Sequence, residues 1–552
     1  MSNTDIPNVA TPTKNLGEDE IGLVVGEATS SEFYFVSEKD RYPPKWEYVV
    51  VDSTEIIDGK PTRVAVLAQV EKIVSASEAL GLGSDIEALR RIKEAELEDV
   101  RTWGKARILG YLCDDNKNVG VLLPRRAVLP GCPIRIAPKA VLEKFYSYPE
   151  DEGLHMGFLI TRPDVPVFCS VSGLKRHLAI IAQTGAGKSY SAGVLVEELL
   201  AKGGTILVLD PHADYVLLSL GVDGNKHPYS DRITIFRNPA STGRYANKNL
   251  GNVEAYTIAF SDLDPEEICT VARVPSKAGN QREAVRIAVN KLRAAGGSYG
   301  PEKLIETLEL IASSPENREY AAGARSVLKY VRTLTKLKVF GLVSTPITQL
   351  LKPVHCSVVD LSGIDEKSMD YISSRILLET YNKVSSGEFP YPVFIFIEEA
   401  HRLIPANTTT FSSSIINRIA AEGRKFGVFL VLITQRPSKI DSNSLSQCNS
   451  QIIMKLTNPQ DQIAVEQSSE RLSKDLLEDL PGLNPGEAVI VGEITRVPVM
   501  LKIRPRTTKE GGADIDVLKK LREAREELEA RQGHIKTMVK ASTPLPGSFS
   551  EV

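Results

Sequence analysis

The sequence predicts an α/β protein whose mostly parallel sheet is preceded by a small β-barrel and interrupted by an all-α insertion. Short β-rich runs separated by turn residues fill residues 19–147, which is typical of a small barrel or sandwich. Over residues 148–508, continuous apolar runs alternate with segments of helical spacing, as expected for strands buried on both faces. Between about 262 and 340 the strand-like runs disappear, and acidic residues, Arg, Ala and Leu recur at helical spacing.

The individual elements follow from the same patterns. Residues 1–18 are polar and aperiodic and are expected to be disordered. In the N-terminal unit, β-rich runs begin at positions 21, 33, 48, 64, 106 and 120, with a helical interlude near 85–101. The insertion is expected to hold about four helices, and the C-terminal segment 509–552 an amphipathic helix over 517–540 followed by a polar tail. Seven apolar runs of the larger unit are predicted to be strands: 178–181, 205–209, 232–236, 356–360, 393–397, 428–433 and 451–456.

Composition places the chain among ordinary globular proteins. Its 552 residues suffice for two or three domains, and 42% apolar with 25% charged residues is typical of that class. The net charge of −3 excludes a polybasic coat, so any contact with nucleic acid must be local. Six scattered cysteines without a C-x-x-C pair argue for reduced thiols. With no signal sequence and no run of roughly 20 apolar residues, the protein is expected to be cytoplasmic and not to engage a membrane.

The N-terminal unit carries a group of basic residues that leaves two interpretations open. They form either a solvated barrel surface or a face that docks a partner or admits DNA. The residues are Lys105, Arg107, Arg125, Arg126, Arg135 and Lys139.

The most informative segment is Ala182-Gln-Thr-Gly-Ala-Gly-Lys-Ser189, which lies between the predicted strand 178–181 and a helical pattern. Glycines allow backbone N–H groups to turn inward around phosphate oxygens, and a helix N-terminus adds a positive dipole end. Lys188 would reach the β- and γ-phosphates, and Ser189 would ligate Mg²⁺. The sequence therefore predicts a P-loop NTPase core that binds ATP and Mg²⁺. The residues expected around the nucleotide are Gln183, Thr184, Gly185, Ala186, Gly187, Lys188, Ser189 and Tyr190, together with Arg176 and Asp210.

Paired carboxylates follow a second apolar strand, in Val393-Phe-Ile-Phe-Ile-Glu-Glu-Ala-His401. Two acids at the tip of a buried strand are costly unless cations or polar groups meet them. Glu398 would hold the metal shell, and Glu399 would polarise water for attack on the γ-phosphate. The alternative is that the two acids only stabilise the N-terminus of a helix.

Two further strand tips carry polar side chains. Gln435 follows the apolar run 428–433, and its amide could sense the γ-phosphate or orient water. Asp210 ends the run that begins at Thr205. It either helps to bind the nucleotide or caps the loop that follows.

Several basic residues are candidates for contacts with a neighbouring subunit or with DNA. Arg424 lies at a predicted helix end, where a basic residue usually compensates the helix dipole. In a ring ATPase, however, such an arginine reaches the γ-phosphate bound by the next subunit, and Arg176 is a second candidate for this role. Arg402 and Lys439 lie in the loops after the Glu398 and Gln435 strands. They are either pore contacts to DNA phosphates or solvated surface charges.

Taken together, these motifs closely resemble the HerA family, the archaeal and bacterial DNA translocases of the HerA–FtsK superfamily. The resemblance implies a HAS-barrel-like domain at 19–147, a RecA-like motor at 148–508 and a C-terminal helical brace at 509–552. Its catalytic lysine, metal-site serine, paired acids, sensor glutamine and trans-acting arginine fall on Lys188, Ser189, Glu398 with Glu399, Gln435 and Arg424.

The same resemblance implies a homohexameric ring that hydrolyses ATP to move double-stranded DNA through its channel. A NurA-type nuclease would be its partner in resecting DNA ends during double-strand break repair. Two alternatives stay open: a nucleotide-gated ring scaffold that does not translocate, and a conjugation-type DNA pump. The paired glutamates argue against the scaffold, because gating by binding alone needs no water activator. The lack of a membrane anchor argues against the pump.

Overall fold

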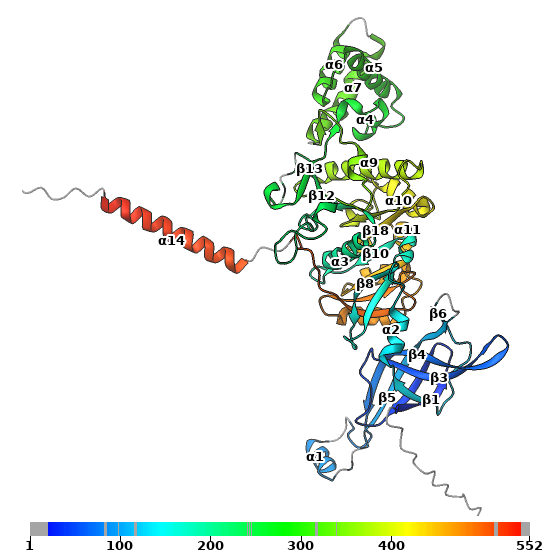
Figure 1. Cartoon of the computed structure of the whole chain (residues 1–552). Helices are drawn as coiled ribbons and strands as arrows, with labels where there is room; N and C mark the ends of the chain where they lie inside the picture. The colour runs from blue at the N-terminus through cyan, green and yellow to red at the C-terminus, as the bar shows by residue number, and fades with distance from the viewer. Residues whose placement is uncertain are drawn as a thin grey trace, which may run out of the picture.

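The computed structural model is an elongated arrangement of three parts (Figure 1). A β-barrel lies at one end, a large sheet with its helices lies in the middle, and a group of helices lies at the other end. Residues 1–18, which the sequence predicts to be disordered, lie outside the described part. The structure describes residues 20–81, 85–95, 97, 99–114, 119–239, 241, 243, 245–314, 318–337, 339–512 and 517–541.

The N-terminal strands close into a barrel. Their order is β2-β1-β7-β3-β4-β5, and β2 also pairs with β5, so that six strands of the described chain form a ring. Strand β7, which closes the barrel between β1 and β3, was not among the predicted runs. The strands are β1 (Glu20–Ala28), β2 (Glu32–Ser37), β3 (Tyr48–Ile57), β4 (Lys60–Ala76), β5 (Arg101–Asp114), β6 (Val119–Leu122) and β7 (Pro133–Ile136).

Alternation along the strands fills the barrel. In β2, Phe33 and Phe35 are fully buried, whereas Tyr34 between them points outward. Phe35 lies opposite Gly104 of β5, and a Cβ on that glycine would lie 2.4 Å from the Phe35 ring. The glycine therefore gives the ring its space. The predicted helical interlude is shorter than expected, since α1 covers Ile86–Glu94 and β5 already begins at Arg101.

The middle part is one sheet of twelve strands within the described residues, in the order β13-β12-β16-β11-β17-β18-β10-β19-β20-β21-β8-β9. The strands from β13 to β19 in this order run parallel, and β20, β21, β8 and β9 add an antiparallel edge. All seven predicted strands are present. The strands are β8 (Gly153–Leu159), β9 (Pro166–Ser170), β10 (Leu178–Ile181), β11 (Thr205–Asp210), β12 (Ile233–Arg237), β13 (Asn252–Ala255), β16 (Cys356–Asp360), β17 (Val393–Ile397), β18 (Val428–Thr434), β19 (Ser450–Met454), β20 (Glu487–Val491) and β21 (Val499–Ile503).

Helices cover both faces of this sheet, which explains the continuous apolar runs. In β10, Ala179 and Ile181 face one core together with residues of α9 and α10, while Leu178 and Ile180 face a second core together with residues of α3. The predicted α/β fold class is therefore confirmed. The covering helices and shorter connecting helices are α2 (Lys139–Tyr146), α3 (Lys188–Ala201), α8 (Ile347–Leu350), α9 (Glu366–Ser385), α10 (Ser413–Glu422), α11 (Ser442–Ser446), α12 (Pro459–Ser468) and α13 (Lys474–Asp479).

The insertion contains the four predicted helices in its described part: α4 (Pro265–Val271), α5 (Gly279–Ala295), α6 (Pro301–Ser313) and α7 (Arg318–Val331). Two short strands, β14 (Ile258–Ala259) and β15 (Phe340–Gly341), pair at its base, where the chain leaves and rejoins the sheet. The insertion lies beyond α9, at the end of the molecule opposite the barrel (Figure 1).

Two interpretations were given for the basic barrel residues, a solvated surface and a face for a partner or DNA. Neither applies to Lys105 and Arg107. They lie between the barrel and the middle part, where both approach Glu71 of β4 and Lys105 also lies 3.2 Å from Asp475 of α13. Burial raises the pKa of Glu71 to about 7 despite these cations. Nearby, the Trp46 indole donates to Asp479 at 2.7 Å. These two basic residues therefore join two parts of one chain.

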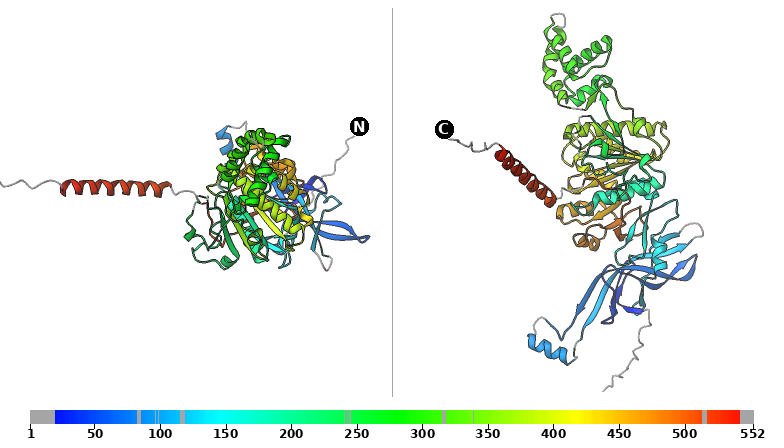
Figure 2. Two further views of the ribbon diagram at one scale, coloured as in Figure 1. Left: turned by 90° about the horizontal axis from the view of Figure 1, so that it is seen from above. Right: turned by 60° about the vertical axis from the view of Figure 1, so that its left-hand side comes forward.

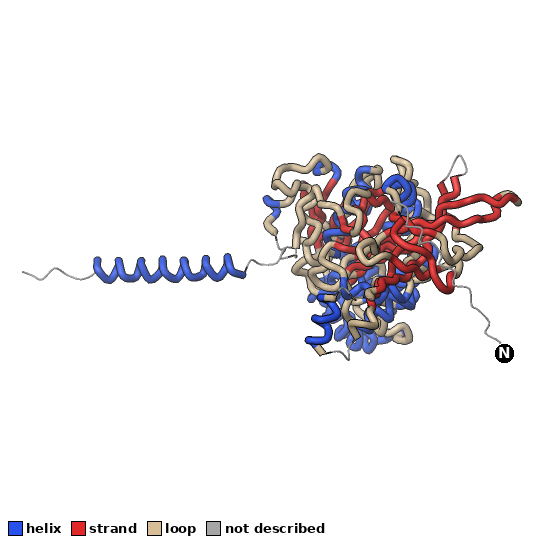
Figure 3. The backbone as a smooth tube through the Cα atoms, turned by 90° about the horizontal axis from the view of Figure 1, so that it is seen from below, coloured by secondary structure: helices blue, strands red, loops and turns tan. Residues whose placement is uncertain are grey.

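The C-terminal helix α14 (Val517–Ala541) projects away from the rest of the molecule (Figures 2 and 3). Its apolar residues Val517, Leu518, Leu521 and Leu528 are exposed. Among the helices that the structure describes, none combines the length and the apolar character needed to cross a bilayer.

The alternation in β2 provides a stability test of the barrel. Replacing buried Phe35 by alanine (Phe35→Ala) should lower the free energy of unfolding by about 3–5 kcal/mol, because a large cavity opens in the barrel core. Tyr34→Ala, at the adjacent outward position, should cost less than about 1.5 kcal/mol. Calorimetric unfolding of the full chain measures both, and equal losses would contradict the assigned register.

Candidate functional site

A cavity of about 770 Å³ lies where β10, β17 and β18 end and α3 begins. In a parallel sheet, ligands bind outside these carboxyl ends of the strands. Eight of the ten residues expected around a nucleotide line this cavity, together with the predicted Glu399 and Gln435. The other two, Arg176 and Asp210, do not line it. Its lining is 183–190, His212, Asp214, Glu399, Gln435, Pro485, Gly486, Lys502, Ile503, Pro505, Glu510, Gly511 and Gly512.

The loop 183–190 has the backbone shape of a phosphate cradle. Gly185 and Gly187 have φ angles of 78° and 107°, in the region where only glycine is unstrained. Gly187 is also the N-cap of α3, so the first N–H groups of that helix face the cavity. The loop is anchored behind, where the Gln183 N–H donates to the Lys455 carbonyl at 3.0 Å. A phosphate group fits such a helix start, because the free N–H groups and the dipole both favour an anion.

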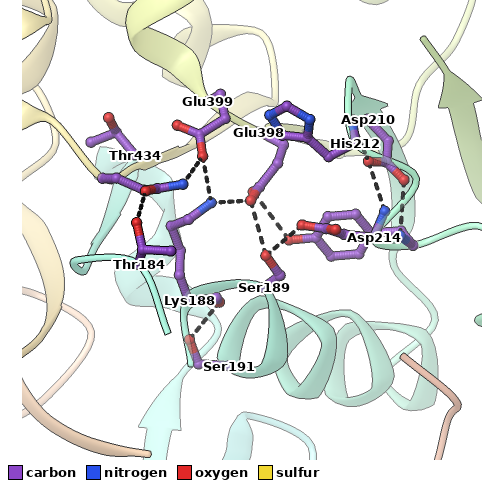
Figure 4. A network of polar contacts seen from close by, with 12 residues as sticks. Thr184, Lys188, Ser189, Ser191, Asp210, His212, Asp214, Glu398, Glu399 and Thr434 are labelled. Atoms are coloured by element: carbon purple, nitrogen blue, oxygen red, sulfur yellow. Dashed lines mark hydrogen bonds and ion pairs between the residues drawn. The ribbon is translucent and has the colours of Figure 1, made fainter. Parts of the chain in front are cut away.

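Lys188 is the centre of a buried ionic group in this cavity (Figure 4). Its ammonium pairs with Glu398 and lies 3.2 Å from Glu399 Oε1. Burial alone would lower the pKa of Lys188, but the two carboxylates outweigh burial and raise it. The lysine is therefore charged and held at the point where phosphates would lie.

Oxygen ligands converge beside Lys188. Ser189 Oγ lies 2.6 Å from Asp214 Oδ2 and 3.1 Å from Glu398 Oε1, and the Tyr215 hydroxyl donates to Glu398 Oε2 at 3.2 Å. Burial raises the pKa of Glu398, and the nearby Asp214 adds to this effect. A hydroxyl between two carboxylates fits Mg²⁺, which binds one or two protein carboxylates and otherwise keeps water or phosphate ligands. In the described chain, no group of three or more acidic, His or Cys side chains could by itself hold a metal ion.

Glu399 is held as an oriented carboxylate. Its Oε1 accepts from Gln435 Nε2 at 2.5 Å, and its Oε2 lies 3.2 Å from His401 Nδ1. Although burial alone would raise its pKa, His401, Lys188 and Gln435 lower it to about 2. Its backbone has φ 49°, a left-handed conformation that is strained for glutamate and that turns the side chain toward the loop. An ionised, buried and fixed carboxylate can accept a proton from water.

Gln435 bridges the phosphate loop and the acidic strand tip. Its Oε1 accepts from the Thr184 hydroxyl at 2.5 Å, while its amide nitrogen contacts Glu399. The side chain is therefore fixed from two sides, with its amide next to both the phosphate loop and the proton-accepting carboxylate.

Asp210 is close to the cavity but does not line it. It is fully buried, and its carboxylate accepts from the backbone N–H groups of Asp214 at 3.0 Å and Tyr215 at 2.8 Å. Of the two roles considered for it, these contacts are those of a loop cap. The loop it holds has Ala213 at φ 61° and brings His212 and Asp214 into the cavity. Sequence reasoning did not select these two residues, although they follow Asp210 in the same strand-tip motif.

The far wall of the cavity comes from the end of the chain and was missed. Residues Glu510, Gly511 and Gly512, assigned above to the C-terminal segment, line it. The Gly511 N–H donates to the Asp214 carbonyl at 2.9 Å, and a Cβ on Gly512 would lie 1.8 Å from Asp214 Oδ1. In the sequence, only the glycine pair Gly511-Gly512 indicates that the backbone approaches another segment closely. The pair does not indicate that this segment contains Asp214.

Glu197 of α3 fixes this C-terminal wall. Its Oε1 accepts from the Thr507 and Thr508 N–H groups at 2.9 and 2.8 Å, and its Oε2 pairs with Arg504 at 2.9 Å. Burial would raise the pKa of Glu197, but its hydrogen bonds to Thr508 and the charge of Arg504 lower it. Helix α3, which begins at the phosphate loop, therefore also holds the C-terminal segment that forms the far wall of the cavity.

Arg176 and Arg424 lie away from the cavity. Arg176 ends a short 3₁₀ turn directly before β10, and Arg424 lies in another, Gly423–Lys425, directly before β18. Both side chains are exposed. Because β10 and β18 are parallel neighbours whose other ends form the cavity, the two arginines lie at the opposite edge of the sheet. Neither is brought to the cavity of its own chain.

The two residues suggested as DNA contacts are separated. Arg402 Nε lies 3.9 Å from Glu366 of α9. Lys439 lines a second cavity, which Arg402 does not line.

The contacts of Glu399 predict the effect of its replacement. Glu399→Gln should lower ATP turnover by about 10²–10⁴-fold, because an amide cannot accept the proton of water. ATP binding should persist, since Lys188 and the loop are intact. Turnover and equilibrium nucleotide binding measure the two effects, and normal hydrolysis by this variant would show that another carboxylate is the base. Lys188→Ala is the matched variant that should lose binding itself.

His177 predicts a pH effect on stability. It lies between Arg176 and the strands, with Nε2 3.1 Å from the Ala420 carbonyl and Nδ1 accepting from the Leu430 N–H at 2.9 Å. Burial lowers its pKa to about 4 from 6.5, so the folded chain favours the neutral ring. Its contribution is complete above pH 6.5 and is lost as the pH falls toward 4. His177→Gln should remove about 1.4 kcal/mol per pH unit from the acid slope of the unfolding free energy, and parallel curves would contradict this.

Comparison with known proteins identifies the family. A family model described as the central domain of helicase HerA matches residues 154–380. A probable helicase of Methanocaldococcus jannaschii is 30% identical over 520 residues, which is 90% of this chain and 93% of that protein. A DNA double-strand break repair helicase HerA of Pyrococcus furiosus is 30% identical over 569 residues, covering 91% and 96% of the two chains.

Among solved structures, the plasmid coupling protein TrwB in complex with ADP and Mg²⁺ is 15% identical and has a TM-score of 0.45 over 69% of this chain and 94% of that one. This likeness is too distant to bear on function. The identity of 30% across nearly the full length of both helicases decides the matter. The chain belongs to the HerA helicase family.

Proposed function

We propose that this chain is an ATP-driven translocase or helicase that acts on double-stranded DNA as a homohexameric ring. The observation that carries the proposal is the buried group formed by Lys188, Glu398 and Glu399 beside a phosphate-binding loop. A binding module needs the loop and the lysine, but it does not need a fixed, ionised carboxylate next to them. Membership of the HerA helicase family supports the same conclusion.

The roles of the residues in hydrolysis follow from their positions. The N–H groups of the loop and Lys188 bind the phosphates of ATP, and Ser189 with Glu398 would hold Mg²⁺, which would neutralise phosphate charge. Glu399 accepts the proton of the attacking water. Gln435, fixed by Thr184, orients that water or senses the γ-phosphate.

The position of Arg424 supports action between subunits. It is exposed at the edge of the sheet opposite its own cavity, so it can reach a phosphate only if that phosphate is bound by another copy of the chain. Arg176, at the same edge, is the second candidate. A ring in which each subunit presents this edge to the next cavity satisfies both residues.

We further propose that the ring works with a NurA-type nuclease in resecting broken DNA ends, in the cytoplasm. Relatives named as DNA double-strand break repair helicases support the pathway, and six unpaired cysteines support a reducing compartment. Because the chain has a net charge of −3, its contacts with DNA must be local, and Lys439 and Arg402 are the candidates.

ATPase assays with and without blunt duplex DNA test the proposal against a nucleotide-gated scaffold. A translocase should hydrolyse ATP several-fold faster with DNA, and its DNA affinity should fall steeply with salt. Hydrolysis that ignores DNA would favour the scaffold.

Mixing two inactive variants tests the trans role of Arg424. Rings of Arg424→Ala subunits alone and of Lys188→Ala subunits alone should both be inactive. In mixed rings, some interfaces pair an intact loop with an intact arginine, so part of the activity should return. ATP turnover across mixing ratios measures this recovery, and its absence at every ratio would exclude Arg424 as the trans arginine.

A further inference from the structure

A second cavity, of about 490 Å³, lies beside the nucleotide cavity. It is formed by the loop after β17 and the loop after β18. The two loops are tied together, since the Ala406 N–H donates to the Lys439 carbonyl at 2.9 Å and Pro405 pairs with Ile440 in an isolated β-bridge. The cavity is therefore a defined feature of the fold. Its lining is His401, Pro405, Ala406, Asn407, Thr408, Arg436 and Lys439.

The chemistry of this lining suits one kind of ligand. Arg436 and Lys439 bring two positive charges, and Asn407 and Thr408 bring neutral hydrogen-bond donors. No acidic residue stands among the lining residues. This is notable in a chain whose acids outnumber its bases, 70 to 67. Two cations with amide and hydroxyl donors bind a phosphodiester without regard to base sequence.

His401 is shared between this cavity and the catalytic group. Its ring lines the second cavity, while its Nδ1 lies 3.2 Å from Glu399 Oε2 and also 3.2 Å from Thr434 Oγ1. A neutral imidazole carries one N–H. With the proton on Nδ1, that nitrogen can donate toward Glu399 or Thr434; with the proton on Nε2, Nδ1 can only accept, from the Thr434 hydroxyl.

Thr434 also contacts the cation side of this cavity. Its Oγ1 accepts from the Arg436 N–H at 3.0 Å. Thr434, the alternative partner of His401, is therefore hydrogen-bonded to the backbone of Arg436, which lines the second cavity.

We propose that the second cavity binds a backbone phosphate of DNA and that His401 signals this binding to Glu399; the inference rests on the function proposed above. An anion in the cavity favours the proton on Nε2, because Nδ1 is the ring nitrogen that lies next to Glu399 and Thr434. Nδ1 then accepts from Thr434 and cannot donate to Glu399 Oε2, which is a buried oxygen without a hydrogen-bond partner among the described residues. That oxygen is free to accept the proton of water. His401 is thus a positioning residue that makes hydrolysis respond to DNA.

The ratio of ATP turnover with and without blunt duplex DNA is the readout, because it is independent of each variant's basal rate. His401→Ala should bring this ratio close to 1, with the KM for ATP unchanged, since His401 does not contact the phosphate loop. His401→Asn places an amide nitrogen near the position of Nδ1 but cannot exchange a proton with a second ring nitrogen. Its ratio should also approach 1, whereas its basal turnover should stay closer to wild type than that of the alanine variant.

Arg436→Ala and Lys439→Ala test the phosphate. Each should lower the ratio and reduce the slope of log affinity against log salt by about 1, the value for one lost phosphate contact. Lys291→Ala removes an exposed lysine from α5 of the insertion and is the matched control. It should change neither the ratio nor the slope.

The outcomes separate the two proposals. A wild-type ratio of 1 with every DNA tested would overturn the proposed function. A raised wild-type ratio that His401→Ala and Lys439→Ala both retain would leave the motor intact and refute the second cavity as its sensor. A third outcome is that Arg436→Ala and Lys439→Ala lose DNA affinity but show a normal turnover ratio at saturating DNA. This outcome would support the phosphate site and refute the signalling role of His401.

Discussion

The nucleotide site depends on one buried ammonium group. Lys188 pairs with Glu398 and Glu399, and the neighbouring Ser189 contacts a third acid, Asp214. Buried carboxylates without a partner repel one another and lose hydration, which is costly. The lysine therefore holds the tips of β10, β11 and β17 in register even before a ligand binds. When a triphosphate enters, Lys188 would exchange part of its carboxylate contact for phosphate, and Glu398 would then be available to hold Mg²⁺.

Two residues around this group have strained backbone angles, and this strain fixes the direction of the nearby side chains. Glu399 and Ala213 both have left-handed backbone angles, and both occur in turns directly after strands that end at the cavity. Such angles cost of order 1–3 kcal/mol each and persist only where the surroundings enforce them. Here the enforcing contacts are those of Gln435 on one side and Asp210 on the other. Orientation of the carboxylates is thus secured by polar side chains, of which Gln435 lines the cavity and Asp210 does not.

Local patterns predicted most of the middle part of the molecule. Runs such as 178–181 and 393–397 coincide with β10 and β17 because a strand buried on both faces leaves an unbroken apolar signature. The motif residues of the phosphate loop and the paired acids could be chosen for the same reason, since each follows such a run. Their convergence in one cavity also follows from the geometry of a parallel sheet.

What could not be predicted depends on contacts between distant segments. Strand β7 has four residues and carries no pattern of its own, yet it closes the barrel. Lys105 looks like a surface charge until Asp475, 370 residues later, is placed beside it. The far cavity wall at Glu510 is fixed by Glu197, and no spacing rule relates the two. The sequence pattern identifies residues whose side chains suit a binding or catalytic site. Which of them come into contact depends on the packing of segments that are distant in sequence.

The wall formed by Glu510, Gly511 and Gly512 has a mechanical consequence. Helix α14 starts five residues after Gly512 and contains 25 residues, so a rod of about 37 Å begins close in sequence to the cavity wall. A tilt of a few degrees at the base of such a rod displaces its far tip by several times the movement at the base. The stretch that closes the pocket is thus also the last described stretch of the chain before this rod.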